Sequence, residues 1–393
     1  MPTVRSWTRP RARSRRVLLV LLLAAQRAST AASAEPAPVP DAERPATRVV
    51  RPALLPSIRL SRAGRHLVRS DTDARFIVWG VNYDHDEAGG RLIEDYWHEH
   101  WPTVVEDLRE IRQLKANTVR IHLQLPRFMD APEQVNERNL AQLAKLLRLA
   151  ERTGLYLDIT GLGCYHKQDV PAWYDRLDEP ARWEVQARFW RAVAQVCRDS
   201  PAVLCYDLMN EPILPGTKPE TEWLTGELGG KHFVQRITLD LAERSRLDVA
   251  RDWVQRLTSA IREVDEQHLI TVGVIPWAHV FKGARPIFYA PEVAGPLDLT
   301  SVHFYPRAGR VDEALKALKV YDVGKPLVVE EIFPLHCSMD EAAAFIDQSR
   351  TIADGWISFY WGRTIEQYQQ QGDLKGAIIA QWLRKFREMA PRE

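Results

Sequence analysis

Two glutamates that end apolar runs are the residues of this sequence best placed to do acid–base chemistry. The run "YDLMNEP" (Tyr206–Pro212) ends on Asn210 and Glu211, and the run "PLVVEE" (Pro326–Glu331) ends on two acids. A strand that stopped for structural reasons alone would end more often in Gly, Ser or Asp. Two carboxyl groups that flank one bond are the groups that hydrolyse a glycosidic linkage. The sequence therefore suggests sugar chemistry.

Other polar and aromatic residues also lie in or at the ends of apolar runs. An arginine beside a carboxylate favours its ionised form, and an aromatic ring can stack on a sugar face. Arg120 could instead tie strands together, and His303 could be a core histidine. The residues are Arg120 and His122 in "NTVRIHL", His303 and Tyr305 in "DLTSVHFY", and Trp361 in "GWISFYW".

Short apolar runs alternate with longer amphipathic stretches from Phe76 onward. This alternation predicts strands, nearly all followed by helices, and hence a parallel sheet. Eight such units favour an α/β fold, a single (β/α)8 TIM barrel with enlarged βα loops. The predicted strands are Phe76–Asn82, Asn117–Leu123, Leu155–Thr160, Val203–Met209, Leu269–Ile275, Asp298–Tyr305, Pro326–Glu331 and Gly355–Trp361.

The barrel would bring these chemical residues together, because its active site lies at the carboxyl ends of the strands. The fifth unit is the weakest, since "FKGARPIFYAPEVAGP" holds too many Pro and Gly for a good helix. Residues 59–75 are predicted to form a hairpin that closes the barrel floor. Pro212 is expected to hold Glu211 in an extended backbone.

The sequence resembles glycoside hydrolase family 5, the cellulase and mannanase family, over about residues 68–390. "YDLMNEP" is similar to the strand 4 signature, and "NTVRIHL", "SVHFYP", "KPLVVEEIF" and "FYWG" follow in the family's order. The resemblance implies a retaining hydrolase with Glu211 as general acid/base and the strand 7 glutamate as nucleophile. It implies that Asn210 binds the sugar 2-hydroxyl, that Arg120 and Tyr305 lie by the nucleophile, that His303 lines the site, and that Trp361 forms its floor.

The strand 7 glutamate is either Glu330 or Glu331. Neighbouring strand residues point to opposite faces, so only one is expected to face the mouth. Counted from Lys325, the family pattern places its glutamate at the seventh position, which favours Glu331. Glu330 is then expected to pair with a neighbouring base.

Two features depart from the family pattern or invite a different chemistry. Strand 3 often ends in His in the family, but Thr160 and Gly161 stand here, so Tyr165 or His166 could substitute from the loop. The stretch "YDHDEAGGRLIEDYWHEHW" (Tyr83–Trp101) holds many potential metal ligands. Its histidines lack metal-site spacing, and a solvated loop beside the cleft is favoured.

The first 34 residues have the pattern of an export signal. Basic residues precede the apolar "VLLVLLLAA" (Val17–Ala25), and "ASA" (Ala32–Ala34) is a small-residue cleavage site. "SRRVLL" loosely resembles a twin-arginine signal, and Sec export stays open. We predict a signal peptide at 1–34, a disordered Pro/Ala-rich spacer at 35–56 and the catalytic domain at 57–393. The mature protein would be periplasmic or extracellular, without stable membrane insertion.

The net charge and the cysteine spacing limit the kinds of binding partner and cofactor that we expect. The net charge of +1 becomes 1 − 7 = −6 without the seven arginines of the signal, which gives no reason to expect nucleic-acid binding. The spacing of the four cysteines matches no zinc pattern. We expect no metal and no organic cofactor, an oligo- or polysaccharide substrate, and a monomer.

The sequence thus predicts an exported retaining hydrolase of a β-linked glycan, with β-1,4-glucan or mannan favoured by the resemblance. A carbohydrate-binding barrel without catalysis is one alternative, although both glutamates are present. A metal-dependent hydrolase is another, although a His-x-His motif is missing from "GVNYDHD". Endo or exo action depends on loops such as residues 214–244.

Overall fold

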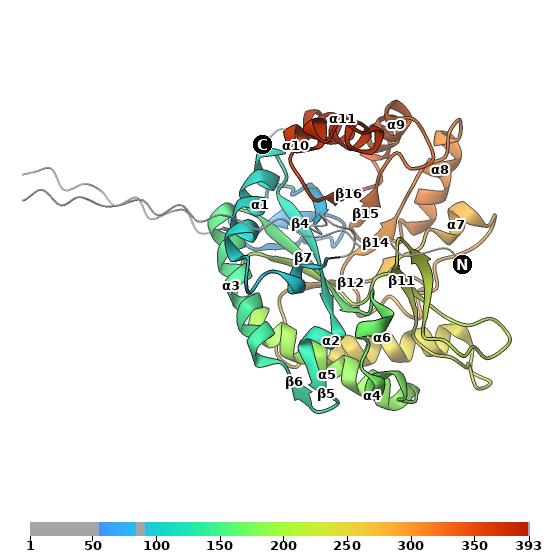
Figure 1. Cartoon of the computed structure of the whole chain (residues 1–393). Helices are drawn as coiled ribbons and strands as arrows, with labels where there is room; N and C mark the ends of the chain where they lie inside the picture. The colour runs from blue at the N-terminus through green and yellow to red at the C-terminus, as the bar shows by residue number, and fades with distance from the viewer. Residues whose placement is uncertain (1–54, 84–90, 392–393) are drawn as a thin grey trace, which may run out of the picture. The chain divides into compact units, whose positions relative to one another are not determined.

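Parallel strands surrounded by helices form the body of the protein (Figure 1). The computed structural model describes residues 55–83 and 91–391. Nine strands are hydrogen-bonded in the order β12-β8-β7-β4-β3-β16-β15-β14-β13. Their bounds are β3 Val78–Tyr83, β4 Thr118–Gln124, β7 Tyr156–Gly163, β8 Val203–Asp207, β12 Leu269–Thr271, β13 Gly273–Val274, β14 Thr300–His303, β15 Leu327–Ile332 and β16 Gly355–Trp361.

The two ends of this order, β12 and β13, are parts of one interrupted strand. β12 pairs with β8 and β13 pairs with β14, and Val272 alone separates them. The Tyr289 hydroxyl lies at the interruption, where it accepts from the Val272 and Ser301 amides and bonds Thr271. The predicted eight-stranded (β/α)8 barrel is therefore confirmed, with its fifth strand broken in the middle.

The helices follow the strands as the sequence predicts, with polar caps at several N-termini. α3 is capped by the Asn136 side chain and ends at Gly154, whose φ of 71° suits glycine. The fifth unit has only the short α7, as its Pro and Gly content predicts. The helices are α1 Trp101–Gln113, α2 Leu125–Phe128, α3 Glu137–Thr153, α4 Ala172–Asp175, α5 Glu179–Cys197, α6 Arg246–Arg262, α7 Trp277–Val280, α8 Val311–Leu318, α9 Met339–Ser349, α10 Ile365–Gln370 and α11 Leu374–Glu388, with 3-10 turns η1 Ile93–Asp95, η2 Lys167–Asp169 and η3 Lys319–Tyr321.

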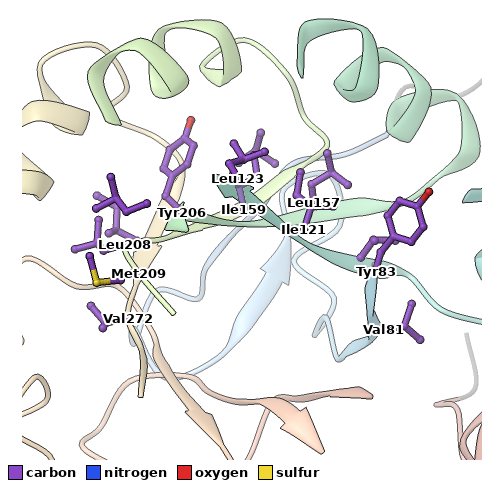
Figure 2. Close-up of a cluster of buried hydrophobic side chains, with 14 of the residues drawn as sticks. Val81, Tyr83, Ile121, Leu123, Leu157, Ile159, Tyr206, Leu208, Met209 and Val272 are labelled. Atoms are coloured by element: carbon purple, nitrogen blue, oxygen red, sulfur yellow. The ribbon is translucent and has the colours of Figure 1, made fainter. Parts of the chain in front are cut away.

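Alternation along the strands separates an apolar outer layer from a polar interior. In β4, Ile121 and Leu123 belong to the main apolar core, whereas Arg120, just before Ile121, points to the other face and donates a hydrogen bond to Asp207 of β8. Figure 2 shows the apolar side chains of β4, β7 and β8 gathered on one side of the sheet, toward the helices. This packing leaves the barrel interior to polar side chains.

A hairpin and an apolar cluster close the barrel floor, where the strands begin. β1 (Ile58–Leu60) pairs antiparallel with β2 (Leu67–Arg69), which confirms the predicted hairpin. Ile58 and Leu67 pack with residues near the strand starts, so the hairpin covers their apolar surface. The cluster is Ile58, Leu67, Phe76, Val78, Tyr156, Leu204, Cys205, Leu269, Leu299, Val328 and Ile357.

The insertion after β8 folds into a small sheet of its own. β10 (Leu224–Leu228) and β11 (Lys231–Arg236) form an antiparallel hairpin, and β11 also pairs parallel with β9 (Pro212–Ile213). The hairpin is thus attached directly to the residues that follow Glu211. A separate two-stranded ribbon is formed by β5 (Met129–Ala131) and β6 (Gln134–Val135).

Several predictions concern parts of the chain that the structure does not describe. The signal peptide and nearly all of the spacer lie outside the described residues, as does His85, the histidine of the "GVNYDHD" segment. The chain divides into two units, Met1–Pro52 and Ala53–Glu393. Among the described residues, no helix has the length and apolar character needed to cross a membrane. All four cysteines are free.

Candidate active site

Arg120 lies at the centre of the polar interior and is fully buried. Its guanidinium donates to Glu331 Oε1 at 2.9 Å, to Asp207 Oδ2 at 2.8 Å, to Asn210 Oδ1 at 2.9 Å and to Asn82 Oδ1 at 3.0 Å. Burial alone would lower the pKa of Arg120, but the surrounding carboxylates raise it well above its usual value. The alternative that Arg120 ties strands together holds as well, because its partners come from several strands.

Glu331 is held by a hydrogen bond on each carboxylate oxygen. Arg120 reaches Oε1, and the Tyr305 hydroxyl donates to Oε2 at 2.7 Å. Burial and the Glu331 charge raise the pKa of Tyr305 well above its usual value, so its hydroxyl stays a donor. Two donors, one of them a cation, fix this carboxylate in one orientation.

Glu211 has a strained backbone rather than an extended one. Its φ is +48°, a left-handed value that is uncommon for residues other than glycine. The expectation that Pro212 keeps Glu211 extended was therefore wrong. The Glu211 amide donates to the Gly273 carbonyl at 2.9 Å, which ties this turn to the broken fifth strand. Such strain is often found where a side chain must point into a site.

His303 connects the two acidic groups. Its Nδ1 lies 2.9 Å from Glu211 Oε1 and 3.5 Å from Glu331 Oε1, and the ring is completely buried. Burial opposes its protonation, but the nearby carboxylates outweigh burial and raise the pKa of His303 to about 10. His303 is thus a cation at neutral pH, in contact with the site rather than an isolated core histidine.

The carboxylates of Glu211 and Glu331 converge. One ligating atom from each of Glu211, His303 and Glu331 lies within 4.8 Å of the other two. These three side chains are also the group of described residues that could surround a metal ion. The protonated His303 ring has no free lone pair for a metal, however, and Arg120 already supplies positive charge at this point. The arrangement suits hydrogen bonding between the acids better than cation binding.

A cavity of 270 Å³ opens beside Glu331. Aromatic and apolar side chains supply much of its wall, and Lys231 and Lys375 add ammonium groups. The described residues that line it are Asn82, Tyr83, Leu92, Ile93, His122, Tyr165, Leu228, Gly229, Lys231, Phe233, Glu331, Phe359 and Lys375. Glu331 therefore faces the mouth, as the residue count from Lys325 favours.

None of the five predicted binding residues lines this cavity, and two of them, Asn210 and Trp361, are almost completely buried. Asn210 is 2% exposed, and its Nδ2 donates to the Phe233 carbonyl at 2.8 Å. Trp361 is 1% exposed and lies against the Tyr83 ring, with 6.0 Å between ring centroids. Neither is among the residues that line the cavity, where Phe359 is the aromatic residue from the last strand. Their predicted roles toward a sugar stay predictions.

The loop after β7 supplies Tyr165, one of the two residues expected to substitute for the strand 3 histidine. Tyr165 lines the cavity, and its hydroxyl hydrogen-bonds His122 Nδ1. Burial and the nearby Arg120 lower the pKa of His122 well below its usual value, so His122 is neutral. The Thr160 hydroxyl that stands at the strand 3 position donates to Asp207 instead, at 2.8 Å. His98, in the histidine-rich stretch, bonds Asn139 at 2.7 Å.

Two buried acids near Arg120 and Glu330, Asp207 and Asp158, were not predicted from the sequence. Asp207 accepts from Arg120, and its pKa is raised to about 6 by burial and by Glu330. Asp158 lies beside Glu330 and has its pKa raised well above the usual value by burial and by that neighbour. The sequence did contain a signal for these acids, because Asp158 and Asp207 each stand between apolar residues of a predicted strand, a pattern that indicates a side chain on the inner face.

The expected pairing of Glu330 is confirmed. Its Oε2 lies 3.5 Å from His303 Nε2 and 3.7 Å from Arg120 Nη2. It is fully buried and is not part of the cavity wall. The expectation that alternation would turn Glu330 to the opposite face was wrong, because both acids reach the same two bases.

Known structures share this fold at low identity. An exo-β-1,4-mannosidase from Opitutaceae bacterium strain TAV5 has a TM-score of 0.62 and 19% identity over 84% of this chain; the match spans only 61% of that protein's length. GH5_18 from Streptomyces cattleya, in complex with GlcNAc, has a TM-score of 0.56 and 21% identity, with 81% and 82% of the two chains covered. The catalytic domain of the Thermobifida fusca endoglucanase Cel5A has a TM-score of 0.55 and 18% identity, with 84% and 97% covered.

The family comparison is more specific. No curated protein matches the sequence of this chain. The model of the cellulase family, glycosyl hydrolase family 5, matches residues 81–364, a range that contains Arg120, Glu211, His303 and Glu331. Because this range covers well over half of the chain, the protein belongs to glycosyl hydrolase family 5 and is a glycoside hydrolase.

Proposed function

We propose that this protein is an exported retaining hydrolase of a β-linked glycan, in which Glu211 is the general acid/base and Glu331 the nucleophile. The observation that carries the proposal is the approach of the two acids, which have carboxylate oxygens within 4.8 Å of each other. A retaining mechanism needs carboxyl groups about 5–5.5 Å apart, whereas an inverting one needs about 6.5–9.5 Å.

In the first step, a Glu331 oxygen attacks the anomeric carbon, and the bond to the leaving oxygen breaks. Arg120 and Tyr305 hold Glu331 as an oriented anion for this attack. Glu211 gives its proton to the leaving oxygen, so the departing sugar leaves as an alcohol. The product of this step is a glycosyl ester on Glu331.

In the second step, water replaces Glu331 at the anomeric carbon. Glu211, now a carboxylate, takes a proton from the water as that water attacks. The Glu331 anion is released and regains its hydrogen bonds from Arg120 and Tyr305. Two displacements restore the original anomeric configuration, and neither displacement requires a metal or an organic cofactor.

The cavity beside Glu331 is suited to a sugar ring. Tyr83, Tyr165, Phe233 and Phe359 supply aromatic surface, and Asn82, His122 and the lysines supply hydrogen-bonding groups. Similar folds occur in an exo-β-1,4-mannosidase and in an endoglucanase. We therefore favour a β-1,4-linked mannan or glucan as the substrate.

A substrate panel with two variants tests this proposal. Aryl β-glycosides, mannan, glucan and their oligosaccharides are incubated with the wild-type protein, with Glu211→Ala and with Glu331→Ala. We expect hydrolysis only by the wild type, a product that first appears in the β configuration by NMR, and azide rescue of each variant. Wild-type rates in both variants would refute the assignment. An absence of turnover on the whole panel would favour the carbohydrate-binding barrel instead.

Export has a separate test. The full chain, expressed in a bacterium with a periplasm, is expected to lose its first 34 residues and to begin at Glu35, which mass spectrometry of the exported protein measures. Replacing Arg15 and Arg16 by Lys distinguishes the routes, because a twin-arginine signal is blocked by this change and a Sec signal is not. Retention of the intact chain in the cytoplasm would contradict export.

A further inference from the structure

An extra residue in β15 brings a second glutamate into the barrel. On one side of β15, Val302 pairs with Val329, but the next pair is His303 with Glu331. On its other side, β15 also advances by one residue more than its neighbour between Val329 and Ile332. This is a β-bulge at Glu330, which explains why two consecutive acids turn toward the same side.

Glu330 is packed among titratable groups from several strands. It lies 3.5 Å from His303 and 3.7 Å from Arg120, and it interacts with Asp158 of β7 and Asp207 of β8. Cys205 and Tyr289 also lie close enough to sense its charge, and both have a pKa raised mainly by burial.

Gly273 leaves the space in which these groups meet. A Cβ atom at this position would lie 2.5 Å from Glu330 Oε2, 2.8 Å from His303 Nε2 and 3.1 Å from Arg120 Nη2. A side chain here would therefore displace at least one of the three. The convergence of Glu330 and His303 depends on this glycine.

His303 bridges Glu330 and the proposed acid/base. Its Nε2 faces Glu330 at 3.5 Å, and its Nδ1 faces Glu211 at 2.9 Å. A carboxylate beside Nε2 favours the form of the ring that carries a proton on that nitrogen. Nδ1 is then the nitrogen that can give a proton to Glu211 or accept one from it.

The charges in this cluster agree with that arrangement. Burial opposes ionisation of Glu330, but Arg120 and His303 outweigh it and lower the pKa of Glu330 to about 2. Burial and Glu330 raise the pKa of Asp158, so Asp158 holds the proton of this acid pair. Glu330 is consequently the charged member, and its anion lies next to Nε2.

We propose that Glu330 is a positioning residue that keeps a proton on His303 Nε2, so that His303 Nδ1 and Glu211 share the proton used in catalysis. This inference rests on the proposed role of Glu211. In the free enzyme, one proton lies between Nδ1 and Glu211. It passes to the leaving oxygen in the first step, and the attacking water returns one proton to the same pair in the second.

The test compares leaving groups in Glu330→Gln and Glu211→Gln. For aryl glycosides with a poor leaving group, we expect Glu330→Gln to lower kcat/KM about 100-fold, because proton donation is impaired. For the dinitrophenyl glycoside, which needs little protonation, we expect less than about a threefold loss. In a plot of kcat/KM against pH, the decline at alkaline pH should also begin at lower pH in Glu330→Gln than in the wild type.

Asp265→Asn is the matched control. Asp265 belongs to another buried histidine–acid pair, with His268 Nδ1 at 2.6 Å, outside the cavity. This variant loses a buried carboxylate but should keep the wild-type leaving-group dependence. Equal losses for good and poor leaving groups in Glu330→Gln would overturn the proposal, since they indicate a structural role only.

Two further results keep the test decisive. If Glu211→Gln also lacks leaving-group dependence, the proposed function fails; if only Glu330→Gln lacks it, the proton-sharing proposal fails alone. Should Glu330→Gln not fold, 15N-histidine NMR of the wild type decides, with His303→Asn to assign the signal. We expect a protonated Nε2 at neutral pH, and an unprotonated Nε2 would overturn the proposal.

Discussion

Two buried histidines at opposite ends of the barrel use the same kind of partner for different purposes. His268 lies just before β12, at the floor, and its Nδ1 bonds Asp265 at 2.6 Å while its Nε2 bonds the Ser200 carbonyl at 3.0 Å. His303 ends β14, at the mouth, and faces Glu211, Glu330 and Glu331 within 3.5 Å.

The two histidines differ in whether each ring nitrogen has one fixed hydrogen-bond partner. One carboxylate and one carbonyl give His268 a single stable arrangement, and its Asp265 also accepts from the Tyr206 hydroxyl at 2.6 Å. His303 is surrounded by more acids than it has protons, so the position of a proton near it can change. The floor pair therefore contributes to stability, and the mouth cluster has the features of a catalytic site.

The largest effect is expected for Glu331→Gln. The amide can keep hydrogen bonds with Arg120 and Tyr305 but cannot attack the anomeric carbon, so kcat should fall about 10⁴-fold or more. The melting temperature should stay close to that of the wild type. Rate assays and thermal unfolding check this, and a kcat within tenfold of the wild type would contradict it.

Glu211→Gln should have a smaller and substrate-dependent effect. Loss of the proton donor should reduce kcat/KM about 10²- to 10⁴-fold for poor leaving groups and much less for dinitrophenyl glycosides. A plot of log kcat/KM against leaving-group pKa should become steeper. An unchanged slope would show that another group donates the proton.

Asp265→Asn should show the opposite pattern. His268 and Tyr206 lose a charged acceptor in a buried place, which should lower the free energy of unfolding by about 1–3 kcal/mol. Catalysis on folded protein should not change. Urea unfolding and kcat/KM measure the two quantities, and a large loss of kcat/KM at unchanged stability would remove the distinction between floor and mouth.

The smallest expected effect is on how the free energy of unfolding depends on pH, which should differ between the His303 cluster at the mouth and the His268–Asp265 pair at the floor. His303 has its pKa raised from 6.5 to about 10, so its stabilisation is complete below 6.5 and is lost as the pH rises through about 10. Burial alone would raise the pKa of Asp265, but His268 and other hydrogen-bond donors outweigh burial and lower this pKa from 3.8 to about 2. The stabilisation by Asp265 is therefore lost as the pH falls through about 2. His303→Gln should flatten the alkaline part of the unfolding curve, and Asp265→Asn the acid part. The same shape for both variants would contradict this.

Much of the architecture was predictable because apolar runs and their polar ends are local patterns. Eight strands, the floor hairpin and the weak fifth helix follow from composition and spacing. Glu211, Arg120, His303, Tyr305 and Glu331 meet because parallel strands end at one face of the barrel. Their order along the chain was sufficient to predict that meeting.

The errors concern features that local patterns do not determine. Glu330 turns inward through a bulge that is defined by pairing with β14 and β16. The backbone of Glu211 is set by the hydrogen bond that its amide donates to the Gly273 carbonyl rather than by the preference that Pro212 imposes. The hairpin after β8 also contributes to the cavity wall, and the sequence indicated only that an insertion was present.

The attachment of that hairpin links substrate fit to the rate of bond cleavage. β11 pairs with Pro212 and Ile213, and the Phe233 carbonyl accepts a hydrogen bond from the Asn210 side chain. The hairpin is therefore bonded to the residues on both sides of Glu211. Leu228 and Lys231 of the same hairpin line the cavity. A glycan that displaces the hairpin on binding would tilt Glu211, the proposed proton donor. Poorly matched sugars should therefore be processed slowly even at saturating concentration.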